Sequence, residues 1–428
     1  MAVAAQSGRS RERVALVLAG GGARGAYEAG ALAALAPALA TREEAPDIIV
    51  GTSIGALNGA FFAARADQPL QATAGAALEM WRELGWGDAF RPLLSPSELG
   101  RLVGATAMLA GFPGVDLSGL LDPSPLRDTL GRFVAFEAIA RNVKDGALTA
   151  AAVVATAYAT TRSVAFHHGG PALGPDLVRA IDYVATPLRP EHVLASAAIP
   201  GAFPAVEVRR PRVAAGWYGD GGVRLNAPLK PALALGADRV VVIGLNSSST
   251  PAQASTRPDA IDGIAQLLQV VLADQLADDV ATLATVNETL PPARSSTGRG
   301  AAGRGKRRRI PYIFIAPSDR LEIGRLAREV YARRYAGIRG LVRDTNLAVL
   351  GRILNAERGP IHGELLSYLF LAREFIDELI ALGRRDAERW LEVQHDAGLW
   401  QIGQLASPTG SAPGRRRSRT RGPHATRA

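Results

Sequence analysis

Two short apolar runs, each closed by glycine and followed by a helix-forming segment, most constrain how this chain folds. Val14–Leu18 ends at three consecutive glycines, after which Ala26–Ala36 predicts a helix that stops before Pro37. The pattern repeats with a buried strand at Asp47–Val50 and a helix at Ile54–Ala64. Strands that alternate with helices favour a mainly parallel sheet covered on both faces.

Later segments extend this pattern before the chain becomes helical. We predict strands at residues 151–157, 239–244 and 310–316, and helix within 261–289. The fold class is therefore α/β, a three-layer α/β/α arrangement, and a C-terminal helical extension follows it. One face of that extension carries an apolar stripe typical of a core-facing helix, with membrane-surface binding as the alternative. The stripe consists of Leu365, Leu369, Ala372, Ile376 and Leu379.

A glycine-, proline- and leucine-rich segment, Leu84–Pro125, shows little periodicity. It is either a lid or substrate wall, or a set of short helices that cap the sheet.

The positive charge of the chain is concentrated in two segments. The net charge is +9, with seven Lys or Arg and no acid in Pro291–Arg309, and six Arg and no acid in Ala406–Ala428. Without those thirteen charges the remainder carries −4. Such segments are solvated linkers, or they attract anionic lipid head groups or nucleic acid; we expect peripheral contact with an anionic membrane and no nucleic-acid partner.

These features predict the organisation of the chain. A flexible N-terminus covers residues 1–12, and the α/β domain covers 13–318, with a disordered basic loop at 291–309 inside it. The helical extension covers 319–404 and a disordered basic tail 405–428.

Composition narrows the compartment and the cofactors. The chain contains no cysteine, which excludes disulfides and thiolate metal sites. No secretion signal is evident, and no apolar stretch reaches the roughly 18 residues that a spanning helix needs. We therefore expect a cytoplasmic protein, peripheral at most to a membrane. The sequence offers no convincing cluster of hard metal ligands, and no cofactor is expected. The sequence does not indicate the oligomeric state.

Gly51-Thr52-Ser53-Ile54-Gly55 is the most specific local motif. A serine between a strand and a helix in this pattern lies on a sharp turn, with its hydroxyl exposed above the sheet edge. Gly51 and Gly55 are needed because larger side chains collide in so tight a turn. Ser53 is thus a candidate nucleophile; the alternative is a glycine-rich turn with a helix-capping serine.

The first glycine turn, Gly20-Gly21-Gly22-Ala23-Arg24-Gly25, has two interpretations. Consecutive glycines let backbone N–H groups converge on an oxyanion, and Arg24 would orient that loop or favour an anionic substrate. The same letters match the dinucleotide fingerprint G-x-G-x-x-G. That fingerprint requires an acidic residue after the second strand, which here ends in the serine motif instead.

A serine nucleophile needs a base. None of the histidines lies in a glycine-rich turn at a strand end, although His167 and His168 end a predicted strand. Asp220 lies in Gly219-Asp220-Gly221-Gly222, where an apolar site would raise its pKa enough for base catalysis. Alternatively this is an ordinary Asp-Gly turn. The six histidines are His167, His168, His192, His362, His395 and His424.

Together, these motifs resemble the patatin-like phospholipase family. Gly20–Gly25, Gly51–Gly55 and Asp220–Gly222 occur in the family's order, and Ala195–Pro204 resembles the segment that precedes its Asp-Gly turn. Segments that also look similar are Gly119–Leu130 and the stretch from Asn226 to Ile243.

The resemblance covers about Val14–Pro317. It implies a Ser53–Asp220 dyad without histidine, and no metal. It also implies an oxyanion hole formed by Gly20, Gly21 and Gly22 with their neighbours Arg24 and Gly25. The implied activity is hydrolysis of fatty-acyl lipid esters through an acyl-enzyme. A carboxylesterase for small soluble esters, a nucleotide-binding dehydrogenase and an inactive lipid-binding module remain as alternatives.

Overall fold

The structure, a computed structural model, describes residues 12–95, 100, 119–225, 228–245, 276–291, 308–394 and 398–404. Its centre is a nine-stranded mixed sheet in which five strand pairs are parallel and three are antiparallel. The main order is β5-β4-β3-β2-β1-β8-β9, and β7 pairs with both β3 and β6. The strands are β1 (Val14–Leu18), β2 (Ile48–Thr52), β3 (Ala150–Ala157), β4 (Ser163–Gly169), β5 (Ile181–Ala185), β6 (Val206–Val208), β7 (Gly216–Asp220), β8 (Arg239–Ile243) and β9 (Tyr312–Ile315).

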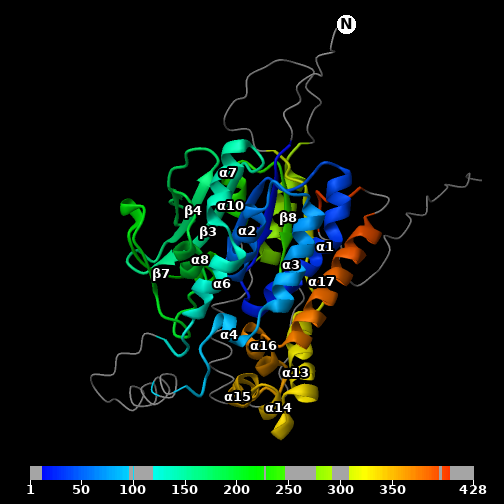
Figure 1. Cartoon of the computed structure of the whole chain (residues 1–428). Helices are drawn as coiled ribbons and strands as arrows, with labels where there is room; N and C mark the ends of the chain where they lie inside the picture. Colours follow the sequence, from blue (N-terminus) through cyan, green and yellow to red (C-terminus); the bar gives the residue numbers. More distant parts are fainter. Residues whose placement is uncertain are drawn as a thin grey trace, which may run out of the picture.

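Helices flank this sheet (Figure 1), so the predicted α/β class is confirmed. The central strands read as continuous apolar runs because both of their faces are covered, and every residue of β1 and β2 is buried. The longer helices of the sheet region are α1 (Gly25–Thr41), α2 (Ile54–Ala64), α3 (Leu70–Glu83), α6 (Pro125–Phe133), α7 (Phe136–Asp145) and α12 (Leu276–Thr289). The short ones are α4 (Trp86–Ala89), α8 (Pro190–Ser196), α9 (Gly222–Leu225) and α10 (Leu229–Ala234), with 3-10 turns η1 (Gly22–Arg24) and η2 (Arg212–Ala214).

The predicted end of the first helix is wrong. We expected the helix to stop before Pro37, but α1 continues to Thr41. Pro37 is exposed and Leu39, two residues later, is fully buried. Pro37 has no N–H to donate to the Ala33 carbonyl, but Ala33 is half-buried, so water can donate to that carbonyl instead. The burial of Leu39 therefore decides the length of the helix.

One topological feature brings two distant segments together. Strand β2 pairs with β3 up to the contact of Thr52 with Val154, and β7 pairs with β3 from the next residue, where Asp220 faces Ala155. Strand β4 occupies the other edge of β3 over the same stretch. Strands β2 and β7 therefore share one edge of β3 and end head to head.

In the described part of the chain, five helices follow the last strand of the sheet, and they pack on helices that flank the sheet. In Figure 1, α17 runs beside α1 and α3, and the other four gather below them. Helices α1 and α17 approach closely at glycines, since a Cβ on Gly30 would lie 2.2 Å from the Ile380 carbonyl oxygen and one on Gly383 would lie 2.1 Å from that of Tyr27. The five helices are α13 (Glu322–Arg334), α14 (Gly337–Arg343), α15 (Thr345–Ile353), α16 (Pro360–Leu369) and α17 (Arg373–Val393).

The predicted apolar stripe is split between two helices. Leu365 and Leu369 belong to α16, whereas Ile376 and Leu379 belong to α17. Residues 370–372, between the two helices, are not helical. Phe370 causes the break, because its fully buried ring packs against Tyr331, Tyr335 and Phe375 at centroid distances of 5.3–6.2 Å. Most of the stripe faces the core, as expected, but Leu369 is only half-buried.

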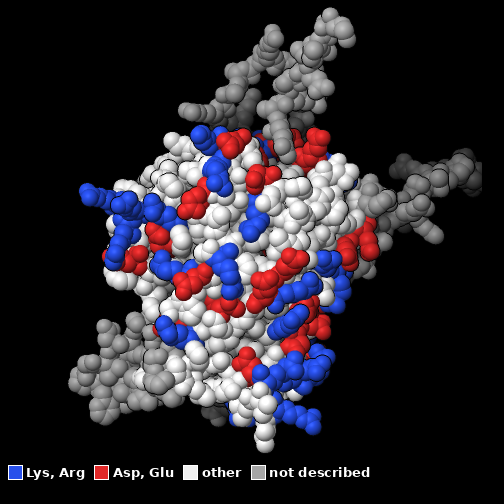
Figure 2. Space-filling view, viewed as in Figure 1, with Lys and Arg blue, Asp and Glu red and all other residues white. Residues whose placement is uncertain are grey.

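Most of the two basic segments lies outside the described residues, as do residues 1–11 and most of the irregular segment after Leu84. Anionic-membrane contact through the basic segments therefore stays a prediction. On the face shown in Figure 2, acidic and basic side chains are interspersed over most of the described surface. None of the described helices combines the length and the apolarity that membrane crossing requires.

Candidate active site

Ser53 lies at the sharp turn between β2 and α2. Its backbone has φ 54° and ψ −123°, a strained conformation for a residue with a side chain. The flanking glycines permit the turn, because a Cβ on Gly51 would lie 2.0 Å from the Gly55 carbonyl oxygen. A Cβ on Gly55 would lie 2.5 Å from the carbonyl oxygens of Leu18 and Ala19. The glycine spacing therefore has a steric origin on both sides of the serine.

Asp220 lies at the end of β7, beside that turn. The Ser53 hydroxyl donates a hydrogen bond of 2.7 Å to its Oδ2, and the Gly222 N–H donates one of 2.6 Å to its Oδ1. The carboxylate is 1% exposed. Burial raises the pKa of Asp220 to about 7, although the hydrogen bonds from Ser53 and Gly222 oppose the rise. Asp220 can thus gain and lose a proton near neutral pH.

Close backbone contacts hold the two residues in register. Ser196 accepts the Ser53 N–H through its Oγ at 2.7 Å and donates its own proton to the Val154 carbonyl at 2.5 Å. The Asp220 N–H donates to the Ala198 carbonyl at 2.8 Å, and a Cβ on Gly221 would lie 2.2 Å from the Val154 carbonyl oxygen. No role for Ser196 was predicted from the sequence, although this residue lies within the motif Ala195–Pro204.

Gly20, Gly21 and Gly22 border the same small cavity as Ser53 and Asp220, together with Ile199 and Tyr368. Gly22 has a φ of +59°, which favours glycine, and a Cβ there would lie 2.0 Å from the Tyr368 carbonyl oxygen. The structure therefore brings the predicted glycine turn to the predicted nucleophile, and it places helix α16 against that turn.

Arg24 and Gly25, the other two residues predicted for the oxyanion hole, do not border the cavities at Ser53. The fully buried Arg24 side chain turns toward α16 and is absent from the residues that border the Ser53 cavity. The backbone N–H of Arg24 donates to the Gly21 carbonyl at 3.3 Å, within the turn. At Gly25, a Cβ would lie 2.5 Å from the Trp81 ring, so this glycine permits close packing of α1.

A buried polar cluster beneath the turn was not foreseen. Glu28 is fully buried and accepts hydrogen bonds from the Ala19 N–H at 2.9 Å and the Asn58 amide at 2.7 Å. Asn58 also donates to the Gly25 carbonyl at 3.0 Å and accepts the Trp81 indole N–H at 3.0 Å. Side chains on α1, α2 and α3 thus fix the start of the glycine turn. No sequence motif indicates this cluster, and it becomes apparent only from the structure.

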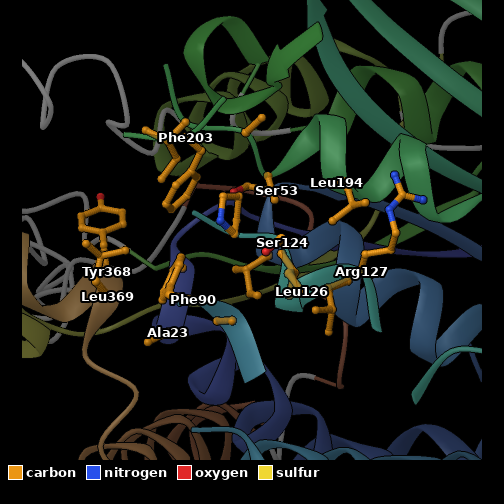
Figure 3. A pocket seen from close by; sticks show the side chains of 18 of the residues that line it. Ala23, Ser53, Phe90, Ser124, Leu126, Arg127, Leu194, Phe203, Tyr368 and Leu369 are labelled. Carbon is orange, nitrogen blue, oxygen red and sulfur yellow. The ribbon is translucent and has the colours of Figure 1, made fainter. Parts of the chain in front are cut away.

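A larger cavity of about 380 Å³ opens beside Ser53. Its walls are mainly aliphatic and aromatic, and within the described residues Arg127 is the one cation and Asp122 the one anion among them. In Figure 3, Tyr368 and Leu369 stand on one side of Ser53, and Leu194 and Arg127 on the other. Leu84, Phe90 and Ser124 also border it; they belong to the irregular segment for which the sequence left open a lid or substrate wall, or short capping helices.

The described histidines lie away from this site. His167 and His168 pair with Ala152 and Ala151, toward the opposite end of β3 from Asp220. Neither they nor His192 and His362 border the cavities at Ser53; His395 and His424 fall outside the described residues. Across the described ranges no group of three or more His, Asp or Glu side chains is arranged to bind a metal.

Comparison with known proteins places this site in a family. No curated protein matches the sequence. Among solved structures, the crystal structure of VipD from Legionella pneumophila is similar, with a TM-score of 0.29 and 11% identity over 71% of this chain. The alignment spans 61% of VipD, less than two thirds of its length. The family model of the patatin-like phospholipases matches residues 16–233, which include the serine turn and Asp220. The chain therefore belongs to the patatin-like phospholipase family.

Proposed function

We propose that the chain is a serine hydrolase that cleaves fatty-acyl esters of lipids, with Ser53 as nucleophile and Asp220 as base. The observation that carries the proposal is the 2.7 Å hydrogen bond from the Ser53 hydroxyl to a buried carboxylate with a raised pKa. A serine hydroxyl is a poor nucleophile unless a neighbouring base takes its proton as the new bond forms. A carboxylate with a pKa near 7 is a far stronger base than one at its ordinary value of 3.8.

The reaction proceeds in two halves. Asp220 accepts the hydroxyl proton as Ser53 Oγ attacks the ester carbonyl carbon, and then returns that proton to the departing alcohol, which leaves an acyl-serine. A water molecule next gives a proton to Asp220 while its oxygen attacks the acyl carbon. The fatty acid is then released, and the proton returns to Ser53.

Negative charge develops on the ester oxygen in both halves. The glycine turn Gly20–Gly22 borders the cavity where this oxygen would lie, and the first turn of α2 begins directly after Ser53. N–H groups at a glycine turn and at a helix N-terminus stabilise such an oxyanion. Losing one donor of this type typically costs about a hundredfold to a thousandfold in kcat.

The shape of the larger cavity favours lipid esters over small soluble ones. Its walls are mainly apolar, and burial of each methylene of an acyl chain contributes about 0.8 kcal/mol. A small ester would leave most of the 380 Å³ unfilled. The carboxylesterase alternative predicts equal rates on monomeric and micellar substrates, whereas a lipase accelerates on aggregates.

The dinucleotide alternative receives less support. A pyrophosphate needs open space along the whole glycine turn, but the Tyr368 backbone packs on Gly22, and the cavity that Gly20 and Gly21 border is about 10 Å³. The inactive lipid-binding alternative does not account for the strained backbone of Ser53. Strain of this kind usually persists at catalytic and other functional sites.

A fluorophosphonate probe tests the proposal directly. Wild-type protein should be labelled and should hydrolyse lysophosphatidylcholine micelles, and Ser53→Ala should do neither. Ser318→Ala is a matched control, because Ser318 is exposed and borders neither cavity. Labelling of Ser53→Ala, or hydrolysis that survives the substitution, would contradict the assignment.

A further inference from the structure

The C-terminal helices contact the catalytic region at its most constrained point. They lie beyond residue 233, where the family match ends, yet the Tyr368 carbonyl oxygen packs on the Cα of Gly22. No side chain fits between the two, since a Cβ on Gly22 would lie 2.0 Å from that oxygen. The glycine turn and the end of α16 are therefore in direct backbone contact.

A buried ion pair fixes this contact. Arg24 Nη2 lies 2.5 Å from Glu364 Oε2, and its Nε donates to the Ser367 hydroxyl at 2.7 Å. The Tyr368 ring covers the guanidinium at 4.0 Å. The other Glu364 oxygen accepts the Gly324 N–H at 2.8 Å, so both oxygens of the carboxylate are bonded. Arg24 therefore ties the turn before α1 to two C-terminal helices.

The break between α16 and α17 aims two side chains at the cavity. Phe370 turns into the aromatic cluster of the C-terminal helices, while Leu369 and Leu371, on either side of it, border the cavity that contains Ser53. Tyr368 borders both this cavity and the smaller one at the glycine turn. A continuous helix would not present residues 369 and 371 to the same side.

We infer that the α16–α17 junction, Tyr368–Leu371, is the wall that sets which acyl chains the enzyme accepts. The inference rests on the proposed function and assigns the acyl chain, rather than the head group, to this side of Ser53. Arg127, the cation of the cavity, stands on the other side of Ser53 (Figure 3), which leaves the junction side apolar. Chain-length preference is thus a property of helices outside the family match.

Leu369 offers the cleanest test because it is half-buried and Phe370, rather than Leu369, anchors the junction. Leu369→Trp narrows the cavity and Leu369→Ala widens it. The measurement is kcat/KM for p-nitrophenyl butyrate, octanoate, dodecanoate and palmitate. Each methylene excluded from the wall changes kcat/KM about fourfold. Leu369→Trp should therefore lower the palmitate-to-butyrate ratio about tenfold or more, and Leu369→Ala should raise or preserve it.

The ratio separates specificity from damage to the fold, since misfolding lowers all four rates together. Ile353→Trp and Ile353→Ala are matched controls in α15, where the side chain is 50% exposed and does not border the cavity. A ratio that is unchanged in both Leu369 variants, with Ser53-dependent hydrolysis intact, would overturn the inference.

A binding measurement separates this inference from the proposed function. Ser53→Ala protein should bind cis-parinaric acid, and fatty acids of increasing length should displace it with a preference that Leu369→Trp shifts toward shorter chains. If Leu369→Trp shifts the preference but wild type shows no Ser53-dependent hydrolysis, the proposed function is refuted, whereas the inference about the α16–α17 junction stands. No shift in displacement would refute the wall.

Discussion

Asp220 reaches the Ser53 hydroxyl at 2.7 Å because the strands that carry them end head to head on one edge of β3. Thr52 faces Val154 in one pair and Asp220 faces Ala155 in the next, so the two side chains emerge at the same point of the sheet. Their separation is set by backbone pairing, and substitutions that change only the acid should leave the geometry in place.

Asp220→Asn should therefore fold normally and lose turnover. The amide has the shape of the acid but cannot take the hydroxyl proton, and general-base catalysis typically contributes about a hundredfold to ten-thousandfold. We expect kcat for a p-nitrophenyl ester to fall by that factor, with an unchanged circular dichroism spectrum. Asp67→Asn, at an exposed loop residue, is the control. Near-normal turnover in Asp220→Asn would assign the base to another group, such as a histidine.

The rate should depend on pH through the same carboxylate. Burial raises the pKa of Asp220 to about 7, and only the deprotonated form can act as base. We expect kcat/KM to rise about tenfold per pH unit below 7 and to level above it. A profile that stays flat down to the ordinary aspartate pKa of 3.8 would show that this carboxylate does not control the reaction.

Stability should show the opposite dependence. Because the folded-state pKa of Asp220 lies above its ordinary value of 3.8, the folded chain binds the proton more tightly. The contribution of this proton is fully present below 3.8 and is lost as pH rises to about 7. The loss amounts to about 4 kcal/mol in the free energy of unfolding.

Asp220→Asn should remove this loss and be more stable than wild type above pH 7. Guanidinium unfolding of both proteins across the pH range measures the difference, which should vanish near the ordinary aspartate pKa. A constant difference at every pH would contradict the linkage.

Arg24 and Glu364 should behave as one buried pair. Arg24→Met leaves the Glu364 charge buried without its partner, which typically costs about 3–5 kcal/mol. Adding Glu364→Gln removes that charge and retains an oxygen for the Gly324 N–H, so the double variant should recover part of the loss. Denaturant midpoints of the two single variants and the double variant measure the coupling. If Arg24→Met instead raised KM for anionic substrates alone, Arg24 would be a substrate-binding cation.

The packing of α17 on α1 can be tested at a glycine. Gly383→Ala puts a methyl group 2.1 Å from the Tyr27 carbonyl oxygen, and overpacking of this kind costs about 1–3 kcal/mol. Gly75→Ala is the matched control in α3, where a Cβ meets no atom within 4 Å and helix propensity should add about 0.5–1 kcal/mol. Thermal melting should therefore move in opposite directions for the two variants.

The local parts of this fold could be predicted from the sequence, and the contacts between distant segments could not. Ile54–Ala64 is a helix with the predicted bounds because its composition and the turn before it decide both ends. The end of α1 was missed because burial of Leu39 outweighs a proline on the exposed side. The break after Leu369 was missed because Phe370 packs on aromatic rings from α13 and α17.

The candidate site divides in the same way. Ser53, Asp220 and the glycine turn could be proposed from spacing and resemblance, but their approach depends on β7 joining the edge of β3. Ser196 bonds to backbone groups of Ser53 and Val154, far from it along the chain, whereas Glu28 bonds to the nearby Ala19 N–H and to the Asn58 side chain. No residue spacing in the sequence encodes these contacts. The junction at Tyr368–Leu371 reads in the sequence as ordinary helical core.

The close crossing of α1 and α17 has a consequence for biosynthesis. The ribosome makes α17 long after α1, the serine turn and Asp220 have emerged, yet α17 closes on α1 and, with α16, on the glycine turn. A nascent chain that lacks these helices has neither the Tyr368 backbone that packs on Gly22 nor Glu364, the partner of Arg24. Esterase activity is therefore expected to appear only after translation has passed α17.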